Sequence, residues 1–216
     1  MKLLQINPVL RTSTSTGRIV REIGEAAMSA GWESYIAYSV GRDGKMSCTS
    51  KRVFVGDPLS VAFHGMITRL FDRHGLASDA ATRRFIKDIE RINPDIIHIH
   101  NIHGYFLNYK ILFDWLSRSG KPVVWTVHDC WLFTGHCYYY MKADCDKWKY
   151  GCGQCPQTRE FPKSWLIDRS AKKLARQEKR ILLHSVRQND HRHRLGLAER
   201  RNAAIFPERF PLQSHT

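Results

Sequence analysis

The sequence predicts an α/β fold, a single Rossmann-like domain with a parallel sheet. Short apolar segments alternate with amphipathic helical segments as far as residue 127, and this alternation is typical of β-α-β units. The composition is that of a globular protein, because 43% of the 216 residues are hydrophobic and 25% are charged. This length is sufficient for one domain with its own core.

The first β-α-β unit occupies the N-terminal part of the chain. Lys2–Asn7 is a short apolar strand, and a polar loop leads from it to Gly17. Apolar residues at helical spacing follow until Gly31, which ends the predicted helix. Ser34–Val40 is expected to be the second strand.

The same alternation continues from residue 51 to residue 127. Each predicted strand is a short apolar run, and each predicted helix has one apolar side. The expected elements are a strand at Lys51–Val55, helices at Leu59–His74 and Ser78–Ile92, a strand at Asp95–His100, a helix at Tyr105–Ser119 and a strand at Pro122–Val127.

The rest of the chain is less regular. Residues 134–156 are dense in Cys, Tyr, Lys and Gly and have no clean period, so we expect a cysteine-rich insertion there. A basic helix is expected from Ser164 to about Arg180. Residues 181–216 are rich in Arg and His, and we expect them to form an irregular basic tail that follows a domain of residues 1–180.

The charge of the chain favours partners that carry phosphate. Lys and Arg number 34 against 20 Asp and Glu, and the resulting net charge of +14 suits nucleic acid, sugar nucleotides or the anionic cytoplasmic face of a membrane. No segment reaches the roughly 20 apolar residues of a membrane-spanning helix, and the N-terminal segment lacks the apolar region of a secretory signal. We therefore expect a cytoplasmic protein whose six cysteines are reduced.

Gly17 is a candidate ligand-binding residue at the start of the first predicted helix. Free backbone N–H groups and the helix dipole attract phosphate at such a position, and a glycine lets a ligand approach the backbone. The G-x-G-x-x-G fingerprint of dinucleotide-binding proteins is absent. A glycine that serves only the turn is an equally good explanation.

Histidines lie at the ends of the last two predicted strands. HIHNIHG supplies His98, His100 and His103, and TVHDCW supplies His128 and Asp129. Ligands of open α/β sheets bind beyond the carboxyl ends of the strands, so we expect His100, His103 and His128 to contact a ligand and His98 to be structural. A purely structural role remains the alternative for each of them. A metal site is also open, although nothing in the sequence fixes a third and fourth ligand.

Four cysteines in residues 134–156 form the pattern C-x7-C-x6-C-x2-C. They are Cys137, Cys145, Cys152 and Cys155. The closing C-x2-C, flanked by glycines, has the form of a zinc knuckle, in which two thiolates turn onto one ion, so a structural zinc site is expected. Buried thiols without metal and a disulfide are the alternatives. Aromatic residues among the lysines of this segment suit stacking on bases or sugars, namely Tyr138, Tyr139, Tyr140, Trp148 and Tyr150.

A zinc-knuckle protein that binds nucleic acid is therefore one hypothesis for the function. The net charge, the cysteines and the interleaved aromatic residues all permit it. The α/β alternation argues against it, because the candidate residues are histidines at strand ends and not basic side chains on a helix face. We find no Ser/His/Asp arrangement and no paired carboxylates at catalytic spacing.

The stretch HIHNIHGYFLNYKILFDWLSRSGKPVVWTVHDCWLFTGHC, with DKWKYGCGQCP after it, resembles bacterial family 4 glycosyltransferases that build capsular, exopolysaccharide or lipopolysaccharide chains. The resemblance covers about residues 1–180. It implies a GT-B fold of two Rossmann-like domains facing a cleft, and this chain resembles the N-terminal, acceptor-side half. It also implies a retaining transfer without a catalytic metal. The expected partners are a nucleotide sugar, a glycan or lipid-linked acceptor, and the cytoplasmic face of the inner membrane.

The resemblance further implies roles for single residues. Gly17 matches the first-loop glycine that approaches the donor diphosphate. His128 matches the histidine that points into the cleft near the transferred sugar, and we expect it to be catalytic, with Asp129 beside it binding substrate. The four cysteines fall in an insertion found in a subset of the family. The acceptor-side loop is matched by His100, Asn101 and His103.

The donor domain of the family, with its basic pair and E-x7-E motif, has no counterpart in this sequence. The E-x7-E spacing of Glu25 and Glu33 lies in and just after the first predicted helix, so we attribute it to chance. We therefore expect a truncated chain that is inactive alone. A one-base shift of the reading frame lets Leu183–His215 be read as a strand and an amphipathic helix of the family type, and we hypothesise that the tail is out-of-frame sequence. A natural basic tail that binds nucleic acid or membrane is the alternative.

Overall fold

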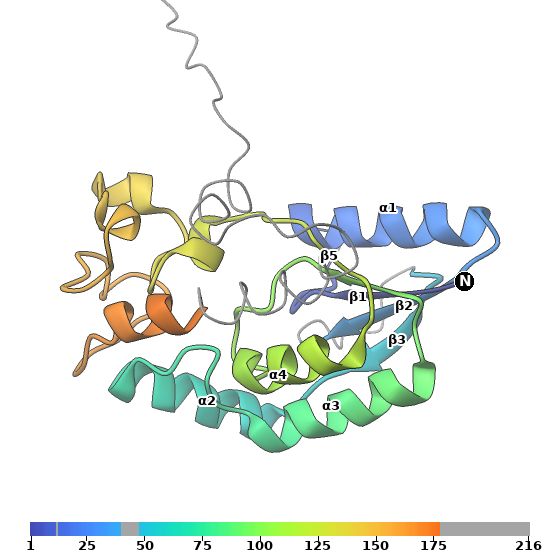
Figure 1. The fold of residues 1–216 in the computed structure, drawn as a ribbon, viewed down its shortest axis with the longest axis horizontal. Coiled ribbons are helices and arrows are strands. Elements are labelled where there is room, and N and C mark those ends of the chain that lie inside the picture. Colours follow the sequence, from blue (N-terminus) through green and yellow to red (C-terminus); the bar gives the residue numbers. More distant parts are fainter. Residues whose placement is uncertain (12, 40–47, 178–216) are drawn as a thin grey trace, which may run out of the picture.

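A five-stranded, all-parallel sheet lies at the centre of the computed structural model, which describes residues 1–11, 13–39 and 48–177 (Figure 1). Its strand order is β3-β2-β1-β4-β5. The chain builds outward from β1 on one side and then continues on the other, which places a topological switch point between β1 and β4. The predicted α/β fold with a parallel sheet is confirmed. The strands are β1 (Lys2–Ile6), β2 (Glu33–Tyr38), β3 (Lys51–Phe54), β4 (Ile96–Ile99) and β5 (Val123–Trp125).

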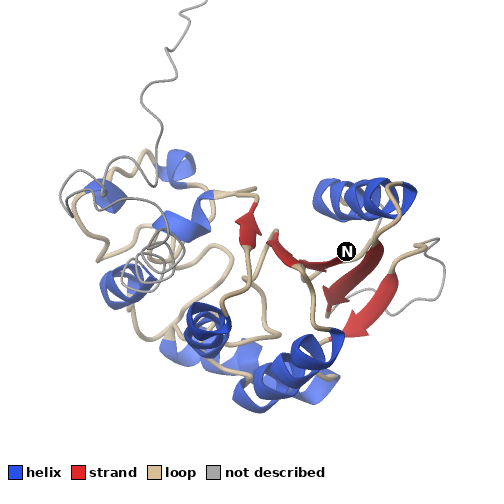
Figure 2. Cartoon of the chain, turned by 45° about the vertical axis from the view of Figure 1, so that its right-hand side comes forward, coloured by secondary structure: helices blue, strands red, loops and turns tan. Residues whose placement is uncertain are grey.

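Helices cover both faces of the sheet (Figures 1 and 2). Helix α1 (Ser15–Ser29) lies on one face, and α3 (Asp79–Ile92) and α4 (Tyr109–Ser119) lie on the other, with α2 (Pro58–Phe71) beside them. None of the helices in the described ranges is long and apolar enough to cross a membrane.

The larger of two hydrophobic clusters lies between the sheet and the helices α3 and α4. Phe85 and Ile89 of α3 and Leu112 and Leu116 of α4 meet Ile97 of β4, and all five are buried. Burial of this many aliphatic and aromatic side chains is the main driving force that holds the two helices on the sheet. The smaller cluster lies beneath α1 and consists of Leu10, Val20, Ile36 and Tyr38.

Some predicted helix boundaries are wrong. The helix expected from Tyr105 begins at Tyr109, because the Asn108 side chain caps it and accepts a hydrogen bond from the Lys110 N–H at 3.0 Å. The helix expected to reach His74 ends at Phe71. The predicted second strand ends at Tyr38, and Val40 lies outside the described residues.

The C-terminal part of the described chain has little regular structure. The basic helix predicted from Ser164 begins at residue 170 and continues to residue 177, where the described residues end. Asp168 accepts a hydrogen bond from the Ser170 N–H at 2.8 Å and so caps the helix at its start. Residues 181–216, with the proposed out-of-frame tail, are outside the described residues. Around and within residues 134–156 lie three short 3₁₀ helices, η1 (Cys130–Phe133), η2 (Tyr140–Ala143) and η3 (Lys147–Lys149).

Candidate functional site

A pocket lies at the carboxyl ends of β4 and β5, the last two strands on one side of the sheet. Five residues that the sequence analysis singled out line this pocket together: His100, Asn101 and His103 after β4, and His128 and Asp129 after β5. The sheet topology thus brings the candidate residues to one place, as expected for an open α/β sheet. Hydrophobic side chains complete the lining: Ile102, Trp125, Val127, Trp131 and Leu132.

A series of hydrogen bonds connects α1 to His128 through the sheet. The Gln5 amide donates from Nε2 to the carbonyl oxygen of Val20 in α1 at 2.9 Å. The Gln5 Oε1 lies 3.1 Å from His100 Nε2, and His100 Nδ1 lies 3.0 Å from His128 Nε2. Gln5 and His100 are buried, so the bonds of Gln5 to Val20 and to His100 are shielded from solvent.

These contacts fix the positions of the imidazole hydrogens. Because Gln5 Oε1 can only accept, His100 Nε2 carries a hydrogen and donates it. A neutral His100 therefore accepts at Nδ1, and His128 donates to it from Nε2. The other nitrogen of His128, Nδ1, keeps its lone pair and can accept a hydrogen bond from a ligand hydroxyl.

The histidines of this series are neutral at pH 7. Burial lowers the pKa of His100 to about 3, and burial likewise lowers the pKa values of His98 and His128. The His98 ring stacks on His100 with ring centroids 4.1 Å apart and bonds Thr126 through Nε2 at 2.8 Å. His98 does not line the pocket, in agreement with its expected structural role.

Asp129 holds His103 in place. One carboxylate oxygen accepts a hydrogen bond from the Trp131 N–H at 2.9 Å, and the other lies 2.6 Å from His103 Nε2. The His103 ring also packs on Tyr138, with centroids 4.3 Å apart. Both oxygens of Asp129 are thus engaged within the protein, and the carboxylate positions the loop that carries His103.

Gly17 lies in the first turn of α1 and does not line the pocket. Its N–H donates to the Thr14 hydroxyl at 3.2 Å, the usual contact of an N-cap. A Cβ at this position would lie 2.1 Å from the carbonyl oxygen of Arg11, so a larger residue requires the loop to move. The close approach of loop and helix is one structural reason for a glycine at this position, and the predicted contact of Gly17 with a donor diphosphate stays a prediction.

Three buried residues that support the site were missed by the sequence analysis: Gln5, His64 and His74. His74 Nε2 accepts the Gly104 N–H at 3.1 Å and so anchors the loop of His103, and His64 Nε2 accepts the Gly75 N–H at 3.1 Å. Only Gln5 has a recognisable signal, a polar amide within the apolar strand KLLQI. The two histidines occupy a helix and a loop that show no pattern around them.

The six cysteines all lie in the described residues, and none of them forms a disulfide. The predicted zinc ligands, Cys137, Cys145, Cys152 and Cys155, line a second pocket. Across the described parts of the chain, no three His, Cys, Asp or Glu side chains already stand at metal-binding spacing.

Comparison with known proteins identifies the family of the chain. The model of Glycosyltransferase Family 4 matches residues 16–152, a range that contains all the residues of the histidine pocket. Over 171 residues, 75% of this chain, the sequence is 30% identical to WcaC of Escherichia coli (strain K12), a protein named as a colanic acid biosynthesis glycosyl transferase. The match spans 41% of the length of that relative. No solved structure matches the chain. The family match covers more than half of the sequence, and the chain therefore belongs to glycosyltransferase family 4.

Proposed function

We propose that this chain is the acceptor-side half of a retaining GT-B glycosyltransferase, which transfers a sugar from a nucleotide sugar to a glycan or lipid-linked acceptor during polysaccharide synthesis. Membership of the family, together with the pocket of His100, Asn101, His103 and His128 at the carboxyl ends of β4 and β5, is the observation that carries the proposal. It favours a transferase over the nucleic-acid-binding alternative.

In this proposal His128 accepts a hydrogen bond from a sugar hydroxyl at Nδ1. Glycosyl transfer passes through a state with positive charge on the sugar ring, and a neutral imidazole orients the sugar without repelling that charge. Gln5 and His100 are positioning residues, because they fix which nitrogen of His128 is free. The leaving diphosphate requires cationic groups, and neither arginine nor lysine lines this pocket in the part of the chain that the structure describes. Those groups would come from a donor half.

The proposal predicts a large effect of His128→Ala in a complete enzyme. Residues 1–177 would replace the matched segment of WcaC, and transfer from sugar nucleotides to membrane acceptors would be measured. Loss of one preorganised polar group at a reacting centre costs about 10²–10³-fold in rate, so we expect a drop of about 100-fold. Tyr139→Ala, at an exposed position outside the pocket, is the matched control.

Two results would contradict the proposal. One is an active hybrid that keeps its full rate after His128→Ala. The other is tight binding of UDP-glucose or GDP-mannose by the present chain alone in calorimetry, since the acceptor-side half is expected to bind them no better than about 1 mM.

We also propose that an apolar face on α2 and the segment of residues 161–167 rests on an anionic membrane. Leu59, Phe63 and Met66 lie four and three residues apart on α2 and are 82%, 55% and 47% exposed. The backbone N–H of Trp165 (51% exposed) donates to the Arg69 carbonyl oxygen at 2.7 Å, which places this residue beside the C-terminal end of α2. Apolar and Trp side chains beside basic residues are typical of helices that lie in the membrane interface.

Membrane contact is tested by sedimentation with vesicles of phosphatidylcholine and phosphatidylglycerol. The double substitution Leu59→Ser with Phe63→Ser is expected to lower vesicle binding at least about tenfold, because it removes two apolar side chains from the interface. Met141→Ser, at an equally exposed apolar residue elsewhere, should leave binding unchanged. Equal binding to vesicles with and without the anionic lipid, or no effect of the double substitution, would refute the proposed contact.

A further inference from the structure

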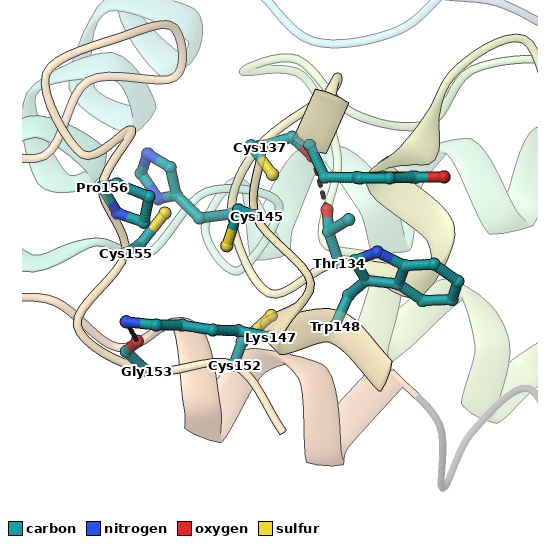
Figure 3. Close-up of a pocket in the computed structure, with 11 residues that line it drawn as sticks. Thr134, Cys137, Cys145, Lys147, Trp148, Cys152, Gly153, Cys155 and Pro156 are labelled. Carbon is teal, nitrogen blue, oxygen red and sulfur yellow. Dashed lines mark hydrogen bonds between the residues drawn. The ribbon is translucent and has the colours of Figure 1, made fainter. Parts of the chain in front are cut away.

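The second pocket is lined by four cysteines that come from three separate turns (Figure 3). Cys137 follows η1, Cys145 lies between η2 and η3, and Cys152 and Cys155 belong to the loop after η3. Figure 3 shows their thiol groups around one small space. Four thiols drawn from distant turns, with no disulfide among them, form the donor set that binds zinc tetrahedrally.

The turn between Cys152 and Cys155 has the backbone of a metal knuckle. Gly153 has a φ of 151° and Gln154 a φ of 45°, so the chain reverses sharply between the two thiols. The Lys147 ammonium clamps this turn, since it donates to the carbonyl oxygens of Gly153 at 3.1 Å and Gln154 at 2.9 Å. It also places a positive charge beside a site that four thiolates would make negative.

Hydrogen-bond donors point at the sulfur atoms. The Gly135 N–H donates to Cys152 Sγ at 3.3 Å, and the backbone of Gln157 hydrogen-bonds the Cys155 thiol. Donors of this kind stabilise a thiolate. Because metal coordination deprotonates a thiol, sulfur atoms that receive such donors are suited to binding a cation.

His136 lies at the same pocket and leaves one buried atom unsatisfied. Its Nδ1 lies 3.0 Å from an oxygen of Asp72, and the carboxylate can only accept, so Nδ1 donates. His136 Nε2 is buried and has no hydrogen-bond partner within the described residues. An unsatisfied buried nitrogen calls for an explanation, and a histidine whose other nitrogen donates to a carboxylate is the usual neighbour or ligand of a metal.

We propose that Cys137, Cys145, Cys152 and Cys155 hold one structural Zn²⁺. Because no three such side chains yet stand at metal-binding spacing in the described parts of the chain, the thiols must rotate inward as the ion binds. The ion would tie together the three turns of residues 134–156. It would thereby fix η1, whose residues Trp131 and Leu132 line the histidine pocket while the following Thr134 lines the cysteine pocket.

The test is the metal content of the purified chain by mass spectrometry, together with a Co²⁺ spectrum. We expect about one zinc per chain and, after exchange, the intense absorption of tetrahedral cobalt with sulfur ligands. Cys145→Ser and Cys155→Ser should each reduce the bound zinc by at least about tenfold at equal free zinc. Cys48→Ser and Cys130→Ser are the matched controls, because these two cysteines do not line the pocket.

Two further measurements test the zinc site if a serine variant fails to fold. Chelation of the wild-type chain should lower its Tm, and added Zn²⁺ should restore it. Zinc retained in His136→Asn supports the ligand set of four cysteines, and zinc lost in that variant with a normal fold overturns it. Absence of zinc from the wild-type chain with no effect of Zn²⁺ on Tm, or iron with acid-labile sulfide in place of zinc, would overturn the proposal.

Discussion

Replacing Asp72 with alanine is expected to lower the free energy of unfolding by about 3–5 kcal/mol. The Asp72 carboxylate is fully buried and accepts from three donors, namely the Lys173 ammonium, the Arg169 N–H at 2.7 Å and His136 Nδ1 at 3.0 Å. Although burial opposes it, the hydrogen bond from His136 and the charge of Lys173 lower the pKa of Asp72. Without the carboxylate, the ammonium of Lys173 would be buried and unpaired.

The measurement is urea unfolding followed by circular dichroism. Asp88→Ala is the control, because Asp88 pairs with Arg91 on an exposed helix surface, where an ion pair contributes below about 1 kcal/mol. The double variant Asp72→Leu with Lys173→Met removes both charges and should recover much of the loss. A decrease below about 1 kcal/mol in Asp72→Ala would show that the buried pair does not join residues 170–177 to the end of α2.

Acidification from pH 7 to pH 4 is expected to lower the free energy of unfolding by about 3 kcal/mol through His64 alone. Burial lowers the pKa of His64 to about 4, against about 6.5 in the unfolded chain. Between these values the unfolded chain binds a proton that the folded chain does not bind, so stability is complete above pH 6.5 and falls with the pH. The geometry explains the requirement for a neutral ring, since His64 Nε2 must accept the Gly75 N–H.

The pH effect is measured by urea unfolding at one-unit intervals of pH. His64→Gln offers an amide in place of the imidazole. It should lower the number of protons taken up on unfolding, which the slope of the free energy of unfolding against pH measures, by about one between pH 4 and 6.5. His100 acts in the same direction, because burial lowers its pKa to about 3. An unchanged slope in His64→Gln would mean that His64 binds its proton equally in the folded and unfolded chains, and would contradict the prediction.

The sequence predicts the sheet well because its signals are local. Apolar runs mark the strands, and the strand order of an α/β domain then brings His100 and His128 to one edge without further information. The contacts that complete the site are not local. Gln5 meets His100 across 95 positions of the sequence, and Asp72 meets Lys173 across 101. A hydrogen bond between distant residues does not change the hydrophobic periodicity of either segment, so only the folded chain shows it.

The helix starts were misplaced for a different reason. Hydrophobic periodicity shows that a helix exists, whereas a single polar side chain determines where it begins. Asn108 and Asp168 each cap a helix a few residues later than the apolar pattern suggests. Capping residues are common in loops as well, and the sequence gives no means of choosing the one that acts.

The short helix η1 separates the histidine pocket from the cysteine pocket. Trp131 and Leu132 face the histidine pocket, and Thr134 at its end faces the cysteine pocket. Excision of residues 134–156 would therefore remove a support of the histidine pocket. Substitutions at residues of one pocket should therefore be accompanied by substitutions at residues of the other.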